Sequence, residues 1–209
     1  MNIEFSQESP RLVKNLTILD GLTRSGKFFL GKIVSGLNNV EFFQYSFALD
    51  YIPYMALLGS IKEDGAISIL RSIVDQSCFD QAIGRNLNHR ISDRSSIYNA
   101  PNHEEYLNRA KSEYKIENVL NHLCKKNRRF VFVLHNNLAN AQIMFKAFPD
   151  LKIIHIMRNP IDLVYSWLKK GYFKTELKKN ADYLKLVGTD PSISGTNGPL
   201  PWYAYKNIS

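Results

Sequence analysis

A glycine-bracketed loop near the start of the chain constrains the fold more than any other feature. The pattern Gly21-x-x-x-x-Gly26-Lys27 follows a short apolar run, residues 16–19, and precedes residues 28–37, where apolar side chains recur at helical spacing. A strand, a tight loop and a helix in this order direct free backbone N–H groups and the positive end of the helix dipole to one point. The sequence therefore predicts an anion-binding loop of the P-loop type at the end of a buried strand.

The residues of this loop favour a phosphate over a metal ion. Arg24 and Lys27 add positive charge, and an arginine can bind a phosphate or sulfate through two parallel hydrogen bonds. Phe28 stands where Mg²⁺-dependent P-loop enzymes carry the Ser or Thr that binds the metal. We therefore predict a loop that binds phosphate without a metal ion. An ordinary glycine turn before a helix is the alternative.

Apolar runs elsewhere in the chain predict further strands of the same sheet. Residues 130–134 and 152–157 are short and largely apolar, which is typical of parallel strands covered on both faces, and therefore of central strands. A shorter run at residues 40–43 predicts one more strand. Helical spacing predicts helices over residues 66–83, 104–126, 138–148 and 162–170.

This alternation of strands and helices predicts an α/β fold. We expect a single domain over residues 1–209, in which a P-loop-type parallel sheet lies between two layers of helices. Residues 47–126 interrupt the alternation and are predicted to form a helical insertion. Gly21, His135 and Arg158 each follow a predicted strand directly, so we expect them at the carboxyl edge of the sheet, where ligands bind.

The charge of the chain favours an anionic partner. Lys and Arg number 27 against 19 Asp and Glu, which gives a net charge of +8, and the basic residues are dispersed rather than gathered in a tail. Two further features of the sequence concern the cellular compartment. The two cysteines, Cys78 and Cys124, are too few for a disulfide framework. The first residues lack the apolar core of a signal peptide, and no apolar run is long enough to span a membrane. We therefore expect a cytoplasmic protein.

A second basic motif follows the strand predicted at residues 152–157. In Arg158-Asn-Pro-Ile-Asp-Leu-Val-Tyr-Ser166, Pro160 suits the first turn of a helix, and Ser166 lies about two turns beyond Arg158. We predict that the guanidinium and the hydroxyl converge on a second phosphate, separate from the one at the glycine loop. A strand-to-helix junction with a solvated arginine is the alternative.

Together and in this order, the two motifs closely resemble the sulfotransferases that use 3′-phosphoadenosine 5′-phosphosulfate (PAPS) as the sulfuryl donor. The resemblance extends from about residue 14 to residue 170. It implies that Arg24 stabilises the transferring sulfuryl group and that Arg158 and Ser166 hold the 3′-phosphate. The residues implied to bind the 5′-phosphosulfate are Gly21, Thr23, Arg24, Ser25, Gly26, Lys27 and Phe28.

The sequence departs from this family at two points. Lys27 and Phe28 stand where the family usually has two small hydroxyl residues, which alters the contacts to the 5′-phosphate. Family members also have a further C-terminal segment, whereas this chain ends soon after a Gly- and Pro-rich stretch at residues 188–201. We therefore expect a short or C-terminally incomplete member of the family.

Sulfuryl transfer to a hydroxyl requires a general base, and histidine is the commonest one near neutral pH. His135 follows the strand predicted at residues 130–134, and the resemblance to small-molecule members of the family makes it the first candidate. Glu41 is the second candidate, because other branches of the family use a Glu soon after the first helix. A structural histidine that caps the next helix is the alternative for His135.

A polar and basic loop, residues 84–98, connects two of the predicted helices and suits an acceptor rich in hydroxyl or anionic groups. The candidate acceptor-binding residues are Arg85, Asn88, Arg90 and Asp93. This loop, together with a resemblance to bacterial-type members of the family, favours a carbohydrate acceptor. The predicted chemistry requires no metal ion, and the histidines lack metal-ligand spacing.

Two other function classes remain open. A P-loop nucleotide kinase or nucleotide hydrolase would explain the glycine loop, but Phe28 removes a Mg²⁺ ligand, and His135 and Arg158 follow the strands where a clear Asp is needed. A non-enzymatic nucleic-acid-binding module would explain the net charge, but the basic residues form no stripe with exposed aromatic residues. PAPS-dependent transfer to a hydroxyl acceptor is therefore the leading prediction, with no nucleic acid as partner.

Overall fold

The computed structural model describes residues 11–170 of the chain, apart from 126–127 and 136. Its strands are β1 (Leu16–Gly21), β2 (Phe130–Val133) and β3 (Lys152–Ile156). Its α-helices are α1 (Lys27–Val34), α2 (Phe47–Leu57), α3 (Glu63–Ala82), α4 (His103–Lys111), α5 (Ile116–Leu120), α6 (Ala141–Ala147) and α7 (Pro160–Lys169). Shorter turns are η1 (Ile97–Asn99), η3 (Leu138–Asn140) and the π-helical η2 (Asn121–Lys125). The Gly- and Pro-rich stretch at 188–201 lies outside the described residues.

The strands form a parallel sheet in the order β2-β1-β3, which confirms the predicted α/β class. The chain passes from β1 to one side for β2 and then crosses to the other side for β3. The carboxyl end of β1 is thus the point where the strand order reverses, and ligands of open α/β sheets bind there. Gly21 ends β1 at this point and is paired with Ile156 of β3.

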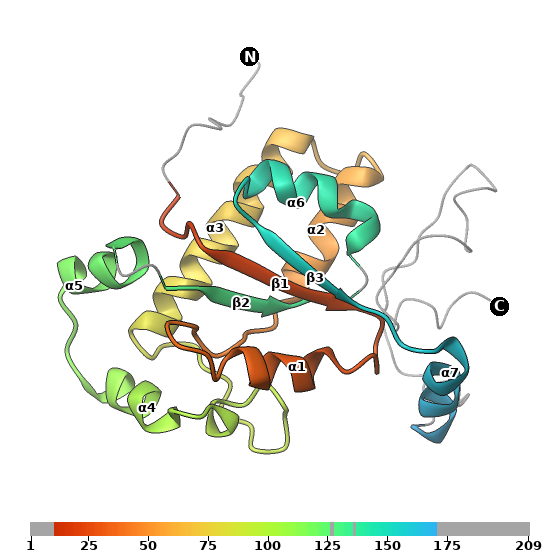
Figure 1. Ribbon diagram of the computed structural model, residues 1–209. Coiled ribbons are helices and arrows are strands. Elements are labelled where there is room, and N and C mark those ends of the chain that lie inside the picture. Colours follow the sequence, from red (N-terminus) through yellow and green to blue (C-terminus); the bar gives the residue numbers. More distant parts are fainter. Residues whose placement is uncertain (1–10, 126–127, 136, 171–209) are drawn as a thin grey trace, which may run out of the picture.

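Helices cover both faces of the sheet, because the side chains of β1 and β2 alternate between two apolar clusters (Figure 1). Ile18 and Phe132 face the layer formed by α2, α3 and α6. Leu19 and Val133 face the opposite side, where α1 packs on β1 and β2. All four side chains are buried, so β1 and β2 each contribute apolar surface to two cores.

The outer strands differ from the sequence-based expectation. The sequence predicts a strand at residues 40–43, but this segment forms only isolated bridges: Val40 pairs with Arg129, just before β2, and Gln44, one residue beyond the segment, pairs with Phe132 of β2. The strand predicted as central at residues 152–157 forms β3, which is an edge strand within the described part of the chain. Its side chains are accordingly only partly buried or exposed.

The helix predicted over residues 104–126 is wrong as a single element. The chain instead forms α4, then α5 and the π-helical turn η2. Tyr106 of α4 packs in the cluster on the α1 side of the sheet, whereas Val119 and Leu123 pack in the cluster on the other side. A straight helix could not reach both clusters, so tertiary packing overrides the continuous periodicity. None of the helices in the described part of the chain is long and apolar enough to cross a membrane.

A buried carboxylate connects the segment before α2 to α4, to η2 and to the residues just before β2. Glu41 is fully buried and accepts hydrogen bonds from the Tyr106 hydroxyl at 2.6 Å, from Arg109 at 3.1 and 3.2 Å, and from Arg128 at 2.9 Å. The His122 ring lies 2.8 Å from the same carboxylate. We call these five residues the Glu41 cluster. Although burial opposes ionisation, the His122 hydrogen bond and the Arg109 charge lower the pKa of Glu41 to about 2.

We expect Glu41→Gln to destabilise the fold by about 3–5 kcal/mol, because it removes the buried counter-charge of the partly buried Arg109 and Arg128 and leaves them only the more exposed Glu105. The folded pKa lies below the ordinary value, so the contribution of Glu41 is complete above about pH 4.5 and is lost as the pH falls toward 2. Melting temperatures between pH 7 and pH 3 measure both effects.

The exposed Glu113→Gln is the matched control and should melt as the wild type does. An unchanged melting temperature for Glu41→Gln would contradict a stabilising role for the Glu41 cluster.

Candidate functional site

Glycine allows the loop after β1 to turn back against the sheet. Gly21 has a φ of 148°, and a Cβ there would lie 2.6 Å from the Ile156 carbonyl oxygen and 2.9 Å from the Ser25 hydroxyl. Gly26 has a φ of 108° and begins α1 without a side-chain cap. The first N–H groups of α1, at Lys27 and Phe28, have no acceptor within the helix. The loop, residues 21–27, thus presents free donors at the end of β1, as its sequence predicts.

The second basic motif lies directly against this loop. Arg24 Nε donates to the Ser166 hydroxyl of α7 at 3.1 Å, and Arg158 donates to the Arg24 carbonyl at 3.2 Å. Trp167 Nε1 also donates to the Thr23 carbonyl at 2.8 Å. Side chains separated by more than 130 residues therefore meet at one place, and the two motifs form one continuous surface.

The start of α7 fixes the direction of this second motif. Asn159 is the N-cap residue, and its side chain accepts a hydrogen bond from the Ile161 N–H at 2.9 Å. Pro160 occupies the first turn, as predicted from its sequence position. Ser166 then falls on the side of the helix that meets Arg24.

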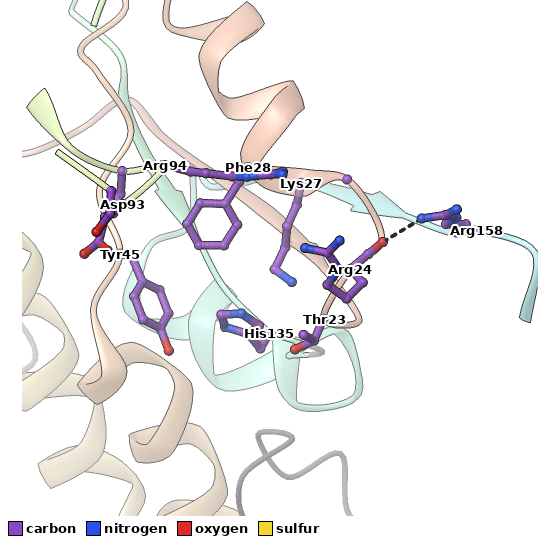
Figure 2. Close-up of a pocket in the computed structure, with 12 residues that line it drawn as sticks. Thr23, Arg24, Lys27, Phe28, Tyr45, Asp93, Arg94, His135 and Arg158 are labelled. Carbon is purple, nitrogen blue, oxygen red and sulfur yellow. Dashed lines mark hydrogen bonds between the residues drawn. The ribbon is translucent and has the colours of Figure 1, made fainter. Parts of the chain in front are cut away.

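A pocket of about 470 Å³ opens between the glycine loop, the end of β2 and the loop before η1 (Figure 2). It is lined by Thr23, Arg24, Gly26, Lys27, Phe28, Tyr45, Ser92, Asp93, Arg94, Ser95, His135 and Arg158. Four of these side chains are cationic at neutral pH and one is an acid. This excess of positive charge favours an anionic ligand.

Lys27 is the most unusual cation of the pocket, because it is only 2% exposed. Its ammonium donates to the Leu22 carbonyl at 3.0 Å and points into the pocket beside Arg24 (Figure 2). Burial lowers the pKa of Lys27 to about 8, although the charges of Asp50 and Asp20 oppose this shift. Lys27 is therefore mostly charged at neutral pH and titrates in the mildly alkaline range.

The side chains of Ser25 and Phe28 lie in different surroundings within the loop. The Ser25 hydroxyl does not line the pocket; it is buried near Gly21 and has no hydrogen-bond partner among the described residues. The Phe28 ring packs edge-on against Phe43 at 5.7 Å between centroids, so an apolar contact replaces the hydroxyl of the usual motif. An unsatisfied hydroxyl beside free loop N–H groups fits an anion such as a phosphate.

His135 lies at the carboxyl edge of the sheet, as the sequence predicts, two residues after the end of β2 and in the wall of the pocket. Its ring meets Tyr45 edge-on at 5.0 Å and Phe28 at 6.2 Å between centroids. Nδ1 lies 3.0 Å from Asp50 of α2, which is fully buried. The other candidate base, Glu41, does not line the pocket, and its carboxylate is engaged in the Glu41 cluster.

Asp93 is the one predicted acceptor residue that lines the pocket. The others hold the chain in place: Arg85 Nε donates to Asp80 at 2.8 Å, and Arg90 Nε donates to Ser92 at 3.0 Å. Asn88 donates to Ser95 at 3.0 Å and to Asp93 at 3.3 Å. Their polar groups therefore shape the loop that forms one wall of the pocket.

Several residues of the pocket were not among the predicted site residues. They are Tyr45 and Ser92 in the wall, and the buried Asp20 and Asp50 beneath it. Asp20 accepts from the Asn137 N–H at 2.8 Å and from the Leu138 N–H at 3.1 Å. The two acids carry a signal in the sequence, because each is a lone carboxylate within an apolar run, and a buried carboxylate needs partners.

A model of the sulfotransferase family matches residues 68–189, which is more than half of the chain. The chain belongs to the sulfotransferase family. The matched range includes Asp93, His135, Arg158 and Ser166, whereas the glycine loop precedes it. No match was found among curated proteins or among solved structures. Within the part of this sulfotransferase that the structure describes, no group of three or more His, Cys, Asp or Glu side chains could hold a metal ion.

We expect the affinity for adenosine 3′,5′-bisphosphate to fall about tenfold between pH 7 and pH 9, because Lys27 loses its proton near pH 8. The charged form favours the anion, so binding is strongest below pH 8 and weakens above it. Calorimetric titrations across this range measure the effect.

In Lys27→Met the affinity should be lower at pH 7 and nearly flat up to pH 9. The exposed Lys14→Met is the control and should retain the wild-type profile. A wild-type affinity that does not change with pH would rule out a contact between Lys27 and the anion.

Proposed function

We propose that this sulfotransferase moves a sulfuryl group from PAPS to a hydroxyl of a carbohydrate acceptor. Membership of the family supports sulfuryl transfer in general. The finer proposal rests mainly on one observation, the contact of Arg24 with Ser166 and of Arg158 with the Arg24 carbonyl. Two cationic motifs joined at one pocket suit a donor that carries phosphate groups at both its 5′ and 3′ ends.

In this proposal the glycine loop holds the 5′-phosphosulfate. The N–H groups of Lys27 and Phe28 face the phosphate at the start of α1, where the helix dipole also favours an anion. A rotation of the Ser25 side chain would supply its unsatisfied hydroxyl to the same group. Arg158 and Ser166 hold the 3′-phosphate in this proposal, because both contact Arg24 from the second basic motif.

The transfer step requires one proton acceptor and a cluster of positive charge. His135 Nε2 takes the proton of the acceptor hydroxyl while the hydroxyl oxygen forms a new bond to sulfur. The bond between sulfur and the bridging oxygen breaks, and its electron pair stays on the 5′-phosphate of the departing adenosine 3′,5′-bisphosphate. Arg24 and Lys27 offset the negative charge that develops on the sulfuryl oxygens and the bridge.

The acceptor is proposed to bind between His135 and the loop that contains Asp93 and Arg94. Both polar side chains line the pocket, and either can hydrogen-bond to a sugar hydroxyl. Tyr45 contributes an aromatic ring to the same pocket, next to His135. A mixed wall of polar and aromatic groups suits a sugar ring, which has hydroxyl edges and an apolar face.

Transfer of radiolabelled sulfate from PAPS to a panel of saccharides and phenols tests this function. We expect transfer to saccharides and a loss of roughly 10²–10⁴-fold in His135→Ala, with binding of adenosine 3′,5′-bisphosphate nearly unchanged. In Glu41→Gln we expect transfer to persist at temperatures below its melting point. Transfer to phenols alone would refute the carbohydrate acceptor, and full activity of His135→Ala would refute the assignment of the base.

Recognition of the 3′-phosphate is tested by Arg158→Ala. Loss of one charge-assisted contact should weaken binding of adenosine 3′,5′-bisphosphate by about ten- to a hundredfold. Binding of adenosine 5′-phosphate, which lacks the 3′-phosphate, should stay the same. Calorimetry with both nucleotides gives the ratio of the two affinities in the wild type and in Arg158→Ala.

Lys152→Ala is the matched control, because it removes an exposed positive charge from the other end of β3. It should leave the affinities for both nucleotides unchanged. If the wild-type protein binds the two nucleotides with equal affinity, Arg158 does not bind the 3′-phosphate.

A further inference from the structure

One buried carboxylate, that of Asp50, holds the His135 ring in place. Asp50 Oδ1 accepts hydrogen bonds from the His135 backbone N–H and from the Asn137 side chain, each at 2.7 Å. Asp50 Oδ2 lies 3.0 Å from His135 Nδ1. Burial, followed by the nearby Asp50 charge, raises the pKa of Tyr45. Several donors thus converge on this carboxylate.

These contacts determine which ring nitrogen of His135 carries the proton. A carboxylate only accepts hydrogen bonds, so the nitrogen that faces Asp50 must be the N–H donor. The neutral ring then carries its lone pair on Nε2. In the described part of the chain Nε2 has no hydrogen-bond partner, and the ring lines the pocket. Only this tautomer leaves Nε2 able to take a proton from a ligand in the pocket.

We propose that Asp50 is a positioning residue that fixes His135 in the Nδ1–H tautomer and holds its Nε2 ready for the acceptor hydroxyl. The inference rests on the proposed function of His135 as the base. Asp50 itself does not line the pocket, so it acts on the reaction through His135.

The structure contains a second pair of the same kind, which serves as a control. His155 Nδ1 lies 2.8 Å from Asp20 Oδ2. The His155 ring belongs to β3 and does not line the pocket, so its tautomer has no role in the transfer step. His155→Gln should therefore leave the transfer rate close to that of the wild type.

Asp50→Asn is the most informative substitution, because it preserves the shape of the side chain and reverses one hydrogen bond. The oxygen of the new amide is expected at the position of Oδ1, where two N–H donors require an acceptor. The NH₂ group of the amide then faces His135 Nδ1 and donates to it. The ring must shift to the Nε2–H tautomer, which cannot accept a proton from the acceptor hydroxyl.

Two-bond ¹H–¹⁵N correlation spectra of the histidine rings measure the tautomers directly and need no substrate. We expect Nδ1–H for His135 in the wild type and Nε2–H in Asp50→Asn, with the His135→Gln spectrum identifying the signals. We also expect kcat to fall on the order of 10²–10⁴-fold in Asp50→Asn. The Asp50 charge raises the pKa of Lys27, so nucleotide affinity is compared at pH 6, where Lys27 stays charged in both proteins. At that pH the affinity for adenosine 3′,5′-bisphosphate should stay within about twofold.

The inference and the proposed function fail in different ways. An Nε2–H ring in the wild type overturns the inference, whether or not the protein transfers sulfuryl groups, and this result needs no variant to fold. Wild-type kcat in Asp50→Asn together with the reversed tautomer also overturns it. An Nδ1–H ring in a protein that shows no sulfuryl transfer supports the role of Asp50 in fixing the ring and refutes the proposed function.

Discussion

Two buried carboxylates, Asp20 and Asp50, hold the carboxyl edge of the sheet on which the candidate site depends. They come from β1 and α2, and both bind the segment that follows β2, at His135, Asn137 and Leu138. Carboxylates buried in this way are costly unless donors and positive charges surround them. Because Asp20 and Asp50 need such partners, Lys27 lies in the same region. The shared contacts also hold the ends of β1 and β2 next to each other.

This arrangement would allow one pocket to combine phosphate recognition with the proton transfer that we propose for His135. One wall of the pocket presents the free N–H groups and cations of the glycine loop, and Arg158 and Ser166 extend that surface toward α7. Another wall presents His135, whose ring is held by the Asp50 carboxylate. Lys27 connects the two parts of the pocket. Its positive charge is balanced by the buried Asp50 and Asp20, and its ammonium group faces the pocket.

Local patterns in the sequence were sufficient for the fold class, the glycine loop and the strand ends, because each depends on neighbouring residues. Contacts between distant residues were not accessible in this way. Glu41 ranked as a candidate base by its position, but its partners Tyr106 and Arg128 come from 65 and 87 residues further along the chain. Asp50 was missed because it lies 85 residues before His135, and only its place in an apolar helix indicated burial.

The central claim is that the two motifs form one site for a nucleotide with 3′- and 5′-phosphates and that this site needs no metal ion. Calorimetric titration with adenosine 3′,5′-bisphosphate in EDTA, compared with ATP in excess Mg²⁺, tests this most directly. We predict binding of the bisphosphate that Mg²⁺ does not change, and binding of ATP at least about tenfold weaker. Binding of ATP that requires Mg²⁺, with no preference for the bisphosphate, would contradict the claim.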